Sequence, residues 1–345
     1  MNARQRSGVT VEEVSGSLAT PAHRFDADVL TGLLAGGMPP RWVRGLLATF
    51  PDPDAWRAAP LRPGEDPAWR LLPRKDSGST ALVLGTENYP WMFAALTAPP
   101  PVLYVEGDES LLGPAVGIIG SREITALGTA VASIAARHAV ALNAPVVTGL
   151  ARGVDEHAAR TTLNEQGKVI GIVGASFDRL DDRATALTGD VLRAAGALAC
   201  EVPPGTTTSR SSLLARNRLI AALSCPLLVA EASLTSGTLA CARDAVEMHT
   251  PLVVPLPRVS ARLQPGAHGL LALAGITPRT LVHWPARLFD RYGPDGFANA
   301  VCESGSDIND ALKVFWWLRP RTPQDVSRRL ELLAQERAGT SRSPA

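Results

Sequence analysis

The chain has 345 residues, 46% of them hydrophobic and 19% charged, and its formal net charge is only +1. This length allows one large domain with a smaller partner, since domains usually have ~100–200 residues. The near-neutral charge excludes a uniformly basic protein, so a surface that binds nucleic acid must be a local patch. Only three of the 34 basic residues are lysines. A GC-rich genome explains this bias, which also suits arginine's bidentate binding of phosphate.

Targeting and membrane signals are missing from the sequence. Residues Met1–Ala22 are polar and lack the apolar stretch of a signal peptide. The longest apolar run, Leu219–Ala230, contains Ser224 and Pro226 and falls short of the ~18–20 residues of a membrane span. We therefore expect a cytoplasmic protein that does not contact a membrane.

The four cysteines show neither metal-ligand spacing nor a dense disulfide pattern. They are Cys200, Cys225, Cys241 and Cys302. Because free cysteine behaves as a small apolar side chain, we expect buried thiols and no metal site.

The first part of the chain predicts a small helical domain. Residues 1–24 and the Ser- and Arg-rich tail from Ala338 have the composition of disordered segments. Between them and the main domain, Val29–Leu34 and Trp42–Leu47 have helical periodicity around a Gly/Pro turn at 36–40. We expect residues 25–78 to form this SAM-like helical domain with its Pro- and Gly-rich linker.

Residues 79–290 alternate between short apolar runs and amphipathic segments. The runs predict buried strands, and they are Val102–Val105, Val116–Ile119, Pro145–Thr148, Val169–Val173, Leu198–Glu201, Pro226–Glu231 and Leu252–Pro255. The segments between them predict helices, namely Thr125–Ala141, Asp155–Glu165, a helix containing Asp190–Ala195, Arg216–Leu223 and Gly237–Met248. This alternation predicts an α/β, Rossmann-like domain with a parallel or mixed sheet flanked by helices.

Ligands of such sheets bind at the carboxyl ends of the strands. Four segments with glycine, serine or arginine fall there, at 120–122, 148–155, 209–218 and 231–238. Glycines let backbone N–H groups approach a phosphate, and arginines add bidentate donors. Residues 202–230 contain three arginines and no acidic residue, which is the local basic patch that the overall charge allows.

Each of these features alone has an ordinary structural explanation. Arg216 and Arg218 can equally cap a helix or pair with carboxylates. Asp155 suits the first turn of a helix, where a carboxylate interacts favourably with the dipole. We expect His157 to be a surface residue and Glu231 to hydrogen-bond a loop.

The combination and order of the motifs, however, resemble the bacterial DNA-processing protein A family (DprA, also called Smf). The motifs are Gly-Ser-Arg at 120–122, Thr-Gly-Leu-Ala-Arg-Gly-Val-Asp at 148–155, Glu-Val-Pro-Pro-Gly at 201–205, Ala-Arg-Asn-Arg at 215–218 and Ser-Gly-Thr at 236–238. The resemblance covers about residues 87–282, including Pro-Gly-Ala-His-Gly-Leu-Leu at 265–271.

The resemblance implies a protein without cofactor that binds single-stranded DNA as a homodimer, protects the strand and helps to load a RecA-type recombinase in natural transformation or recombination. It places DNA contacts in the matching loops. The expected DNA-binding residues are Gly120, Ser121, Arg122, Gly149, Arg210, Arg216, Asn217, Arg218, Ser236 and Gly237. No catalytic residue is expected, because no nucleophile stands at recognisable spacing from a base.

The chain departs from the family pattern at several places. Leu213 stands where the family has an aromatic residue that would stack on a base. The segment Gly174–Asp182 lacks the family's Tyr-Pro pair, and Ala159 replaces its histidine, with His157 displaced by two. Residues 291–345 are too short for a complete winged helix, and we expect a short helical segment there. These departures predict a divergent member.

Two other functions stay open at this stage. One is a nucleotide-binding sensor or nucleoside-monophosphate hydrolase of the related lysine-decarboxylase-like group, although the single glycine in Glu231–Thr238 speaks against hydrolysis. The other is a mobile-element defence component that uses the same pocket. A dehydrogenase is disfavoured, because no Gly-x-Gly-x-x-Gly opens the first helix.

Overall fold

The computed structural model describes residues 25–325, apart from 51, 72–77, 207–208, 235, 257–269, 271–272 and 275–299. The predicted disordered ends and most of the motif at 265–271 lie outside these residues. The chain divides into two compact units, 1–103 with 320–345, and 104–319. Within the described residues, no helix is long and apolar enough to cross a membrane.

The first unit contains the two helices predicted near the amino terminus. They are α2 (Ala27–Ala35) and α3 (Pro40–Thr49), and a short helix α4 (Pro53–Ala58) follows them. Asp26 begins α2 and Asp52 begins α4, because each carboxylate accepts a hydrogen bond from a backbone amide of the first turn. Apolar residues of these helices form the core of the unit; they include Leu30, Leu33, Val43, Leu46 and Trp56. This unit also contains β1 (Thr80–Val83) and α5 (Trp91–Ala94).

The sheet of the described residues has nine strands in the order β1-β2-β6-β5-β4-β3-β7-β8-β9. After β1 the strands are β2 (Val102–Gly107), β3 (Ala115–Ile119), β4 (Val146–Thr148), β5 (Val169–Ile172), β6 (Ala197–Cys200), β7 (Ser224–Val229), β8 (Leu252–Pro255) and β9 (Ala300–Cys302). Neighbours from β6 to β9 pair in parallel, whereas β2 runs antiparallel to β6. The predicted mixed, Rossmann-like sheet is confirmed, and its seven predicted strands are present.

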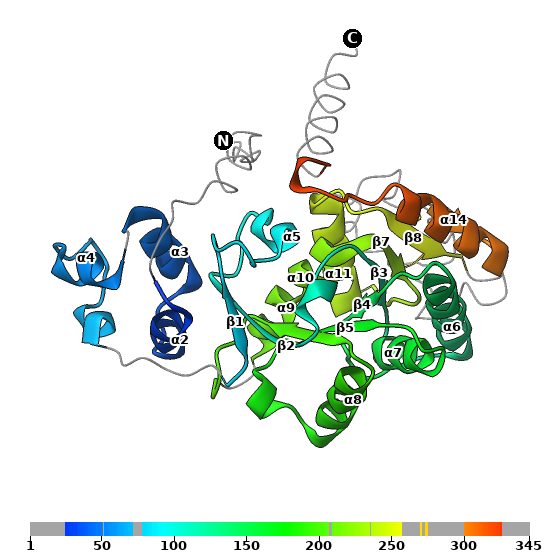
Figure 1. Ribbon diagram of the computed structural model, residues 1–345. Coiled ribbons are helices and arrows are strands. Elements are labelled where there is room, and N and C mark those ends of the chain that lie inside the picture. Colours follow the sequence, from blue (N-terminus) through cyan, green and yellow to red (C-terminus); the bar gives the residue numbers. More distant parts are fainter. Residues whose placement is uncertain are drawn as a thin grey trace, which may run out of the picture. The chain divides into compact units, whose positions relative to one another are not determined.

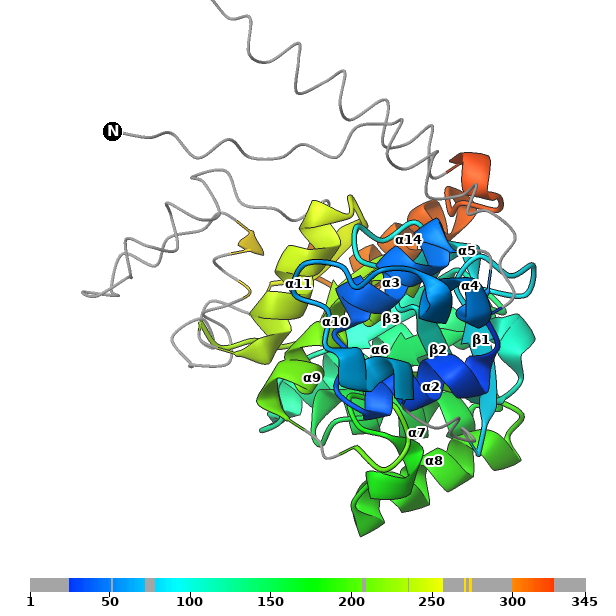
Figure 2. The same cartoon turned by 90° about the vertical axis from the view of Figure 1, so that its left-hand side faces the viewer.

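In the second unit, helices connect the strands on both sides of β3 in the sheet. The helices between β3 and β6 are α6 (Ala126–Ala141), α7 (Val154–Asn164) and α8 (Asp182–Arg193); α9 (Arg210–Ala215), α10 (Asn217–Leu223) and α11 (Gly237–Glu247) flank β7. The chain moves outward from β3 through β6, then returns to β7 and moves outward the other way. Because such crossovers are right-handed, the two sets of helices cover opposite faces. Figure 1 shows α6 beside α7, and Figure 2 shows α10 beside α11.

Helix α14 (Gly305–Trp317) belongs to the second unit. Its buried residues Ile308 and Leu312 join the core formed by α6, α7 and strands β3, β7 and β8. The predicted boundary at residue 290 therefore divides the sheet, since β9 and α14 follow it and complete the same layers. The sequence showed neither the three-residue β9 nor the short β1, because runs this brief have no readable period.

Candidate functional site

The carboxyl ends of β3 and β7 mark the point where the strand order reverses. From β3 the chain proceeds to its neighbour β4, whereas β7 lies on the other side of β3 and leads away to β8. Loops at such a point diverge and leave a crevice, where α/β proteins bind ligands. The predicted turns after β3 and β4 and the segment after β7 all lie at this carboxyl edge of the sheet.

The turns after β3 and β4 are tied together by one buried carboxylate. Asp155, in the first turn of α7, accepts hydrogen bonds from the amide of Gly120 (3.3 Å) and from that of Gly149 (3.1 Å). Its side chain is almost fully buried. Burial raises the pKa of the Asp155 carboxyl, against the opposing effect of Arg216 and of the backbone amides. The acidic residue of the Gly-Val-Asp motif therefore holds two loops in place.

Arg216 lies beneath these turns and is almost fully buried. One of its Nη atoms donates to the carbonyl oxygens of Gly149 (2.7 Å) and Ile172 (2.6 Å). Only 7% of the residue is exposed. The structure thus places Arg216 under the loops that it was expected to accompany on the surface.

Asn217 is buried as well and connects α10 to α11. Its amide nitrogen donates to the carbonyl oxygen of Gly237 at 3.2 Å. The hydroxyl of Thr238 donates in turn to the carbonyl oxygen of Gly120 at 2.9 Å. Ser236 begins α11, and its hydroxyl donates to the carbonyl oxygen of Ser233. These bonds fix the start of α11 against the turn after β3.

Arg218 has a side-chain partner, unlike Arg216, whose hydrogen bonds go to backbone carbonyl oxygens. Its guanidinium forms an ion pair with Glu201, the residue that follows β6. Both side chains are mostly buried. Of the two explanations considered for Arg218, pairing with a carboxylate is the one that the structure shows.

Arg122 and Arg210 differ from these two arginines because both are exposed. Arg122 follows the Gly120–Ser121 turn, and Arg210 is the first residue of α9, which a capping box at Ser209 and Ser212 begins. Neither arginine has an ion-pair partner among the described residues. The hydroxyl of Ser212 also donates to the carbonyl oxygen of Gly174 at 2.8 Å, which places α9 over the end of β5.

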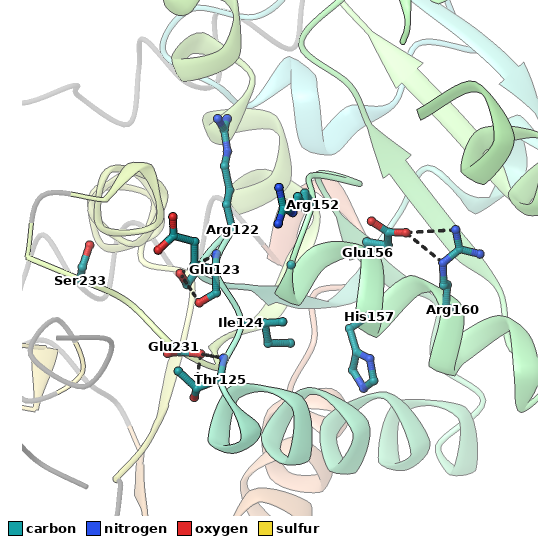
Figure 3. A pocket seen from close by; sticks show the side chains of 12 residues that line it. Arg122, Glu123, Ile124, Thr125, Arg152, Glu156, His157, Arg160, Glu231 and Ser233 are labelled. Carbon is teal, nitrogen blue, oxygen red and sulfur yellow. Dashed lines mark hydrogen bonds and ion pairs between the residues drawn. The ribbon is translucent and has the colours of Figure 1, made fainter. Parts of the chain in front are cut away.

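A cavity of about 830 Å³ opens beside the turn after β3 (Figure 3). Only two of the ten predicted residues, Ser121 and Arg122, line it. The other lining residues come mainly from α7 and from the loops before α6 and after β7; they are Glu123, Ile124, Thr125, Arg152, Gly153, Glu156, His157, Arg160, Glu231 and Ser233. Arg152 was not among the predicted DNA-binding residues; its charge within the motif at 148–155 is the signal that could have identified it.

Glu231 holds Thr125, the residue that caps α6, at one side of this cavity. One carboxylate oxygen accepts hydrogen bonds from the amide (3.0 Å) and the hydroxyl (3.2 Å) of Thr125, where α6 begins. The residue is only 2% exposed. This geometry matches the expectation that Glu231 hydrogen-bonds a loop.

His157 is half-buried between α6 and α7. Its Nε2 lies 2.8 Å from the hydroxyl of Ser133 on α6. Among the residues that the structure describes, no group of three or more His, Cys, Asp or Glu side chains is arranged to hold a metal ion. The cavity is lined by three arginines and three glutamates together with hydroxyls and His157, and its guanidinium groups are donors suited to an anion.

Comparison with protein families adds an independent observation. The family described as DNA recombination-mediator protein A matches residues 80–276. DNA processing protein DprA of Bacillus subtilis is 28% identical over 201 residues, which are 56% of this chain and 68% of the relative. Protein Smf of Synechocystis is 30% identical over 244 residues, covering 64% of this chain and 61% of the relative. The matched part is thus about two thirds of either relative.

Two solved structures are similar as well. DNA processing protein A from Streptococcus pneumoniae has a TM-score of 0.57 at 20% identity, covering 87% of this chain and 96% of that one, which shows the fold. DNA processing protein A from Helicobacter pylori has a TM-score of 0.51 at 26% identity, covering 71% of this chain and 99% of that one. The latter structure concerns the single-stranded DNA binding mode of the H. pylori protein.

Proposed function

The chain belongs to the DNA recombination-mediator protein A family, and from this premise we propose that it binds single-stranded DNA at the carboxyl edge of its Rossmann-like sheet. Arg122 and Arg210 bind backbone phosphates in this proposal. The turn at Gly120–Ser121 and the loop at Gly149 bring the protein backbone close to the DNA strand. The start of α11, at Ser236 and Gly237, borders the same edge of the sheet. Arg216, Asn217 and Arg218 support these loops from below.

The observation that carries the proposal is the contrast among the arginines. Arg216 and Arg218 are mostly buried and engaged, whereas Arg122 and Arg210 are exposed and have no ion-pair partner in the described part of the chain. An unpaired guanidinium in water is free to form bidentate hydrogen bonds with a phosphate. The two emerge near the ends of β3 and β5, which are separated by β4 and hence by about 10 Å.

The rigid base beneath these arginines supports a binding role over a catalytic one. Two buried groups, Asp155 and Arg216, fix the glycine turns before any ligand arrives, and such preorganisation lowers the entropy lost on binding. Glu231, the buried carboxylate of this edge, uses one of its oxygens to hold Thr125 at the start of α6. We therefore propose a non-enzymatic protein.

The remaining elements of the proposal concern the whole protein. The matching family is described as a DNA recombination mediator and the Bacillus subtilis relative as a DNA processing protein, which supports a role in DNA recombination or processing. We propose that a homodimer protects the strand and helps to load a RecA-type recombinase. A mobile-element defence component that uses the same edge of the sheet would also bind single-stranded DNA. It would differ from a recombination mediator in its protein partners.

Fluorescence anisotropy with labelled oligonucleotides tests the proposal. We expect tighter binding to a single-stranded 20-mer than to the duplex, and little competition by a mononucleotide. The logarithm of affinity should fall with the logarithm of salt concentration by about 0.7 for each phosphate contact. Equal affinity for duplex, or an affinity independent of salt, would overturn the proposal. Tight binding of the mononucleotide alone would favour the nucleotide sensor.

A further inference from the structure

The cavity beside the turn after β3 contains a second arginine without an ion-pair partner. Arg152 is exposed, lines the cavity together with Arg122, and forms no ion pair among the described residues. Most other charged groups of the lining are engaged. Glu156 pairs with Arg160 at 3.0 Å, and Glu231 accepts from Thr125. Positive charge at this side of the cavity is therefore held by Arg122 and Arg152.

The backbone holds these two arginines next to each other. The amide of Val154 donates to the carbonyl oxygen of Ser121 at 3.0 Å. Gly153 has a φ of +94°, and a Cβ there would overlap the backbone of Ser121 and Arg122. The loop of Arg152 therefore lies directly against the loop of Arg122. Figure 3 shows both side chains extending away from Glu231 and Thr125.

One acidic residue of the lining opposes the positive charge of this pair of arginines. Glu123 follows Arg122 directly, and its side chain is exposed. Water and salt screen a charge in this position. A guanidinium fork gains from a phosphate by directed hydrogen bonds as well as by charge, so a screened neighbour does not cancel the contact.

We propose that the single strand continues past Arg122 into this cavity and that Arg152 binds a second backbone phosphate there. The inference rests on the proposed function and extends the binding surface from α9 to the loop that precedes α7. A cavity of about 830 Å³ lies within the range of ~300–1,000 Å³ that holds small-molecule ligands, so it has room for a nucleotide unit.

The first test compares the binding of a single-stranded 20-mer by Arg152→Ala and by the parent. For a 20-mer we expect affinity about ten- to a hundredfold lower and a salt slope smaller by about 0.7, since one charge-assisted contact is lost. Arg152→Lys should keep part of the affinity. The matched control is Arg137→Ala, an exposed arginine of α6 that pairs with Glu165 and does not line the cavity; it should bind like the parent.

A second test detects the position of the strand directly. The four native cysteines are buried. A photoreactive azidophenacyl group can therefore be attached selectively to Arg152→Cys and, as control, to Arg137→Cys. Irradiation with the single-stranded 20-mer should crosslink DNA at position 152 and not at position 137.

The outcomes separate the two proposals. Failure of the parent to bind single-stranded DNA overturns the proposed function. A second outcome overturns this inference alone. In that outcome the parent binds single-stranded DNA and Arg122→Ala weakens the binding, but Arg152→Ala binds like the parent and position 152 gives no crosslink. Weaker binding of Arg152→Ala with a crosslink at position 152 supports both.

Discussion

The guanidinium of Arg216 lies directly beneath Gly149 and donates to its carbonyl oxygen at 2.7 Å. A Cβ at position 149 would overlap this guanidinium. Glycine is therefore required here by a close approach of a side chain from below, since the φ of Gly149 is not in the left-handed region. This contact joins the loop after β4 to the residue that precedes α10.

Gly149→Ala should displace Arg216 and loosen both segments. We expect a loss of about 1–3 kcal/mol in the free energy of unfolding, the usual range for overpacking, and weaker binding of single-stranded DNA. Urea unfolding followed by circular dichroism measures the first effect. Gly189→Ala is the control, because Gly189 lies inside α8 with only ordinary contact to Arg193. Alanine there should preserve or raise stability, and equal stability of the two variants would contradict the prediction.

The arginines should fall into two groups when replaced. Arg122→Ala and Arg210→Ala should unfold like the parent, because exposed loop residues contribute little to the core. Each should weaken binding of a single-stranded 20-mer about ten- to a hundredfold. Thermal melting and anisotropy on the same samples check both properties. Parent-like binding by both variants would place the DNA site elsewhere.

Arg216→Met supplies the contrast within this series. It leaves two buried carbonyl oxygens without their donor and removes the positive charge that acts to lower the pKa of Asp155. We expect a loss of about 3 kcal/mol or more in stability. A variant that melts like the parent would show that Arg216 is not the support described above.

The segment that lacks the family's Tyr-Pro pair is anchored by Asp178. Both carboxylate oxygens lie 3.1 Å from the amide nitrogen of Gly205, and these bonds hold the pKa of Asp178 below its usual value. A depressed pKa means that the native state favours the charged form, so the stabilisation is present above the unfolded pKa and lost as pH falls through the native one.

Asp178→Asn should therefore be less stable than the parent at pH 6. The difference should shrink as the pH is lowered from 6 through the native pKa of Asp178, because the parent carboxyl then becomes protonated in both states. Urea midpoints of the two proteins across this range provide the measurement. A difference that stays constant with pH would mean that charge plays no part in the contact with Gly205.

The thiols should be inert in the native state. All four cysteines are buried, and burial raises the pKa of the thiols of Cys200, Cys241 and Cys302, that of Cys302 to about 11. Because the thiolate is the reactive form, Ellman's reagent at pH 8 should react slowly with the native protein and rapidly with four thiols after unfolding in guanidinium. Rapid reaction of one thiol in the native protein would locate an opening near that residue.

The order of elements and the edge that carries the site were predictable from the sequence. Buried parallel strands are continuous apolar runs, such as Val116–Ile119 and Leu252–Pro255, and their carboxyl ends lie at one edge of a sheet whatever the lateral order of the strands. Glycine, serine and arginine at those ends were therefore recognisable as candidates before the strand order was known.

Only the tertiary structure decided which arginine does what. Arg210, Arg216 and Arg218 lie within nine residues on one basic segment, yet they are respectively exposed, buried under Gly149 and paired with Glu201. Those partners are 67 and 17 residues away in the chain. Local sequence records the presence of a charge, whereas its burial and its partner depend on which distant segment the fold brings against it.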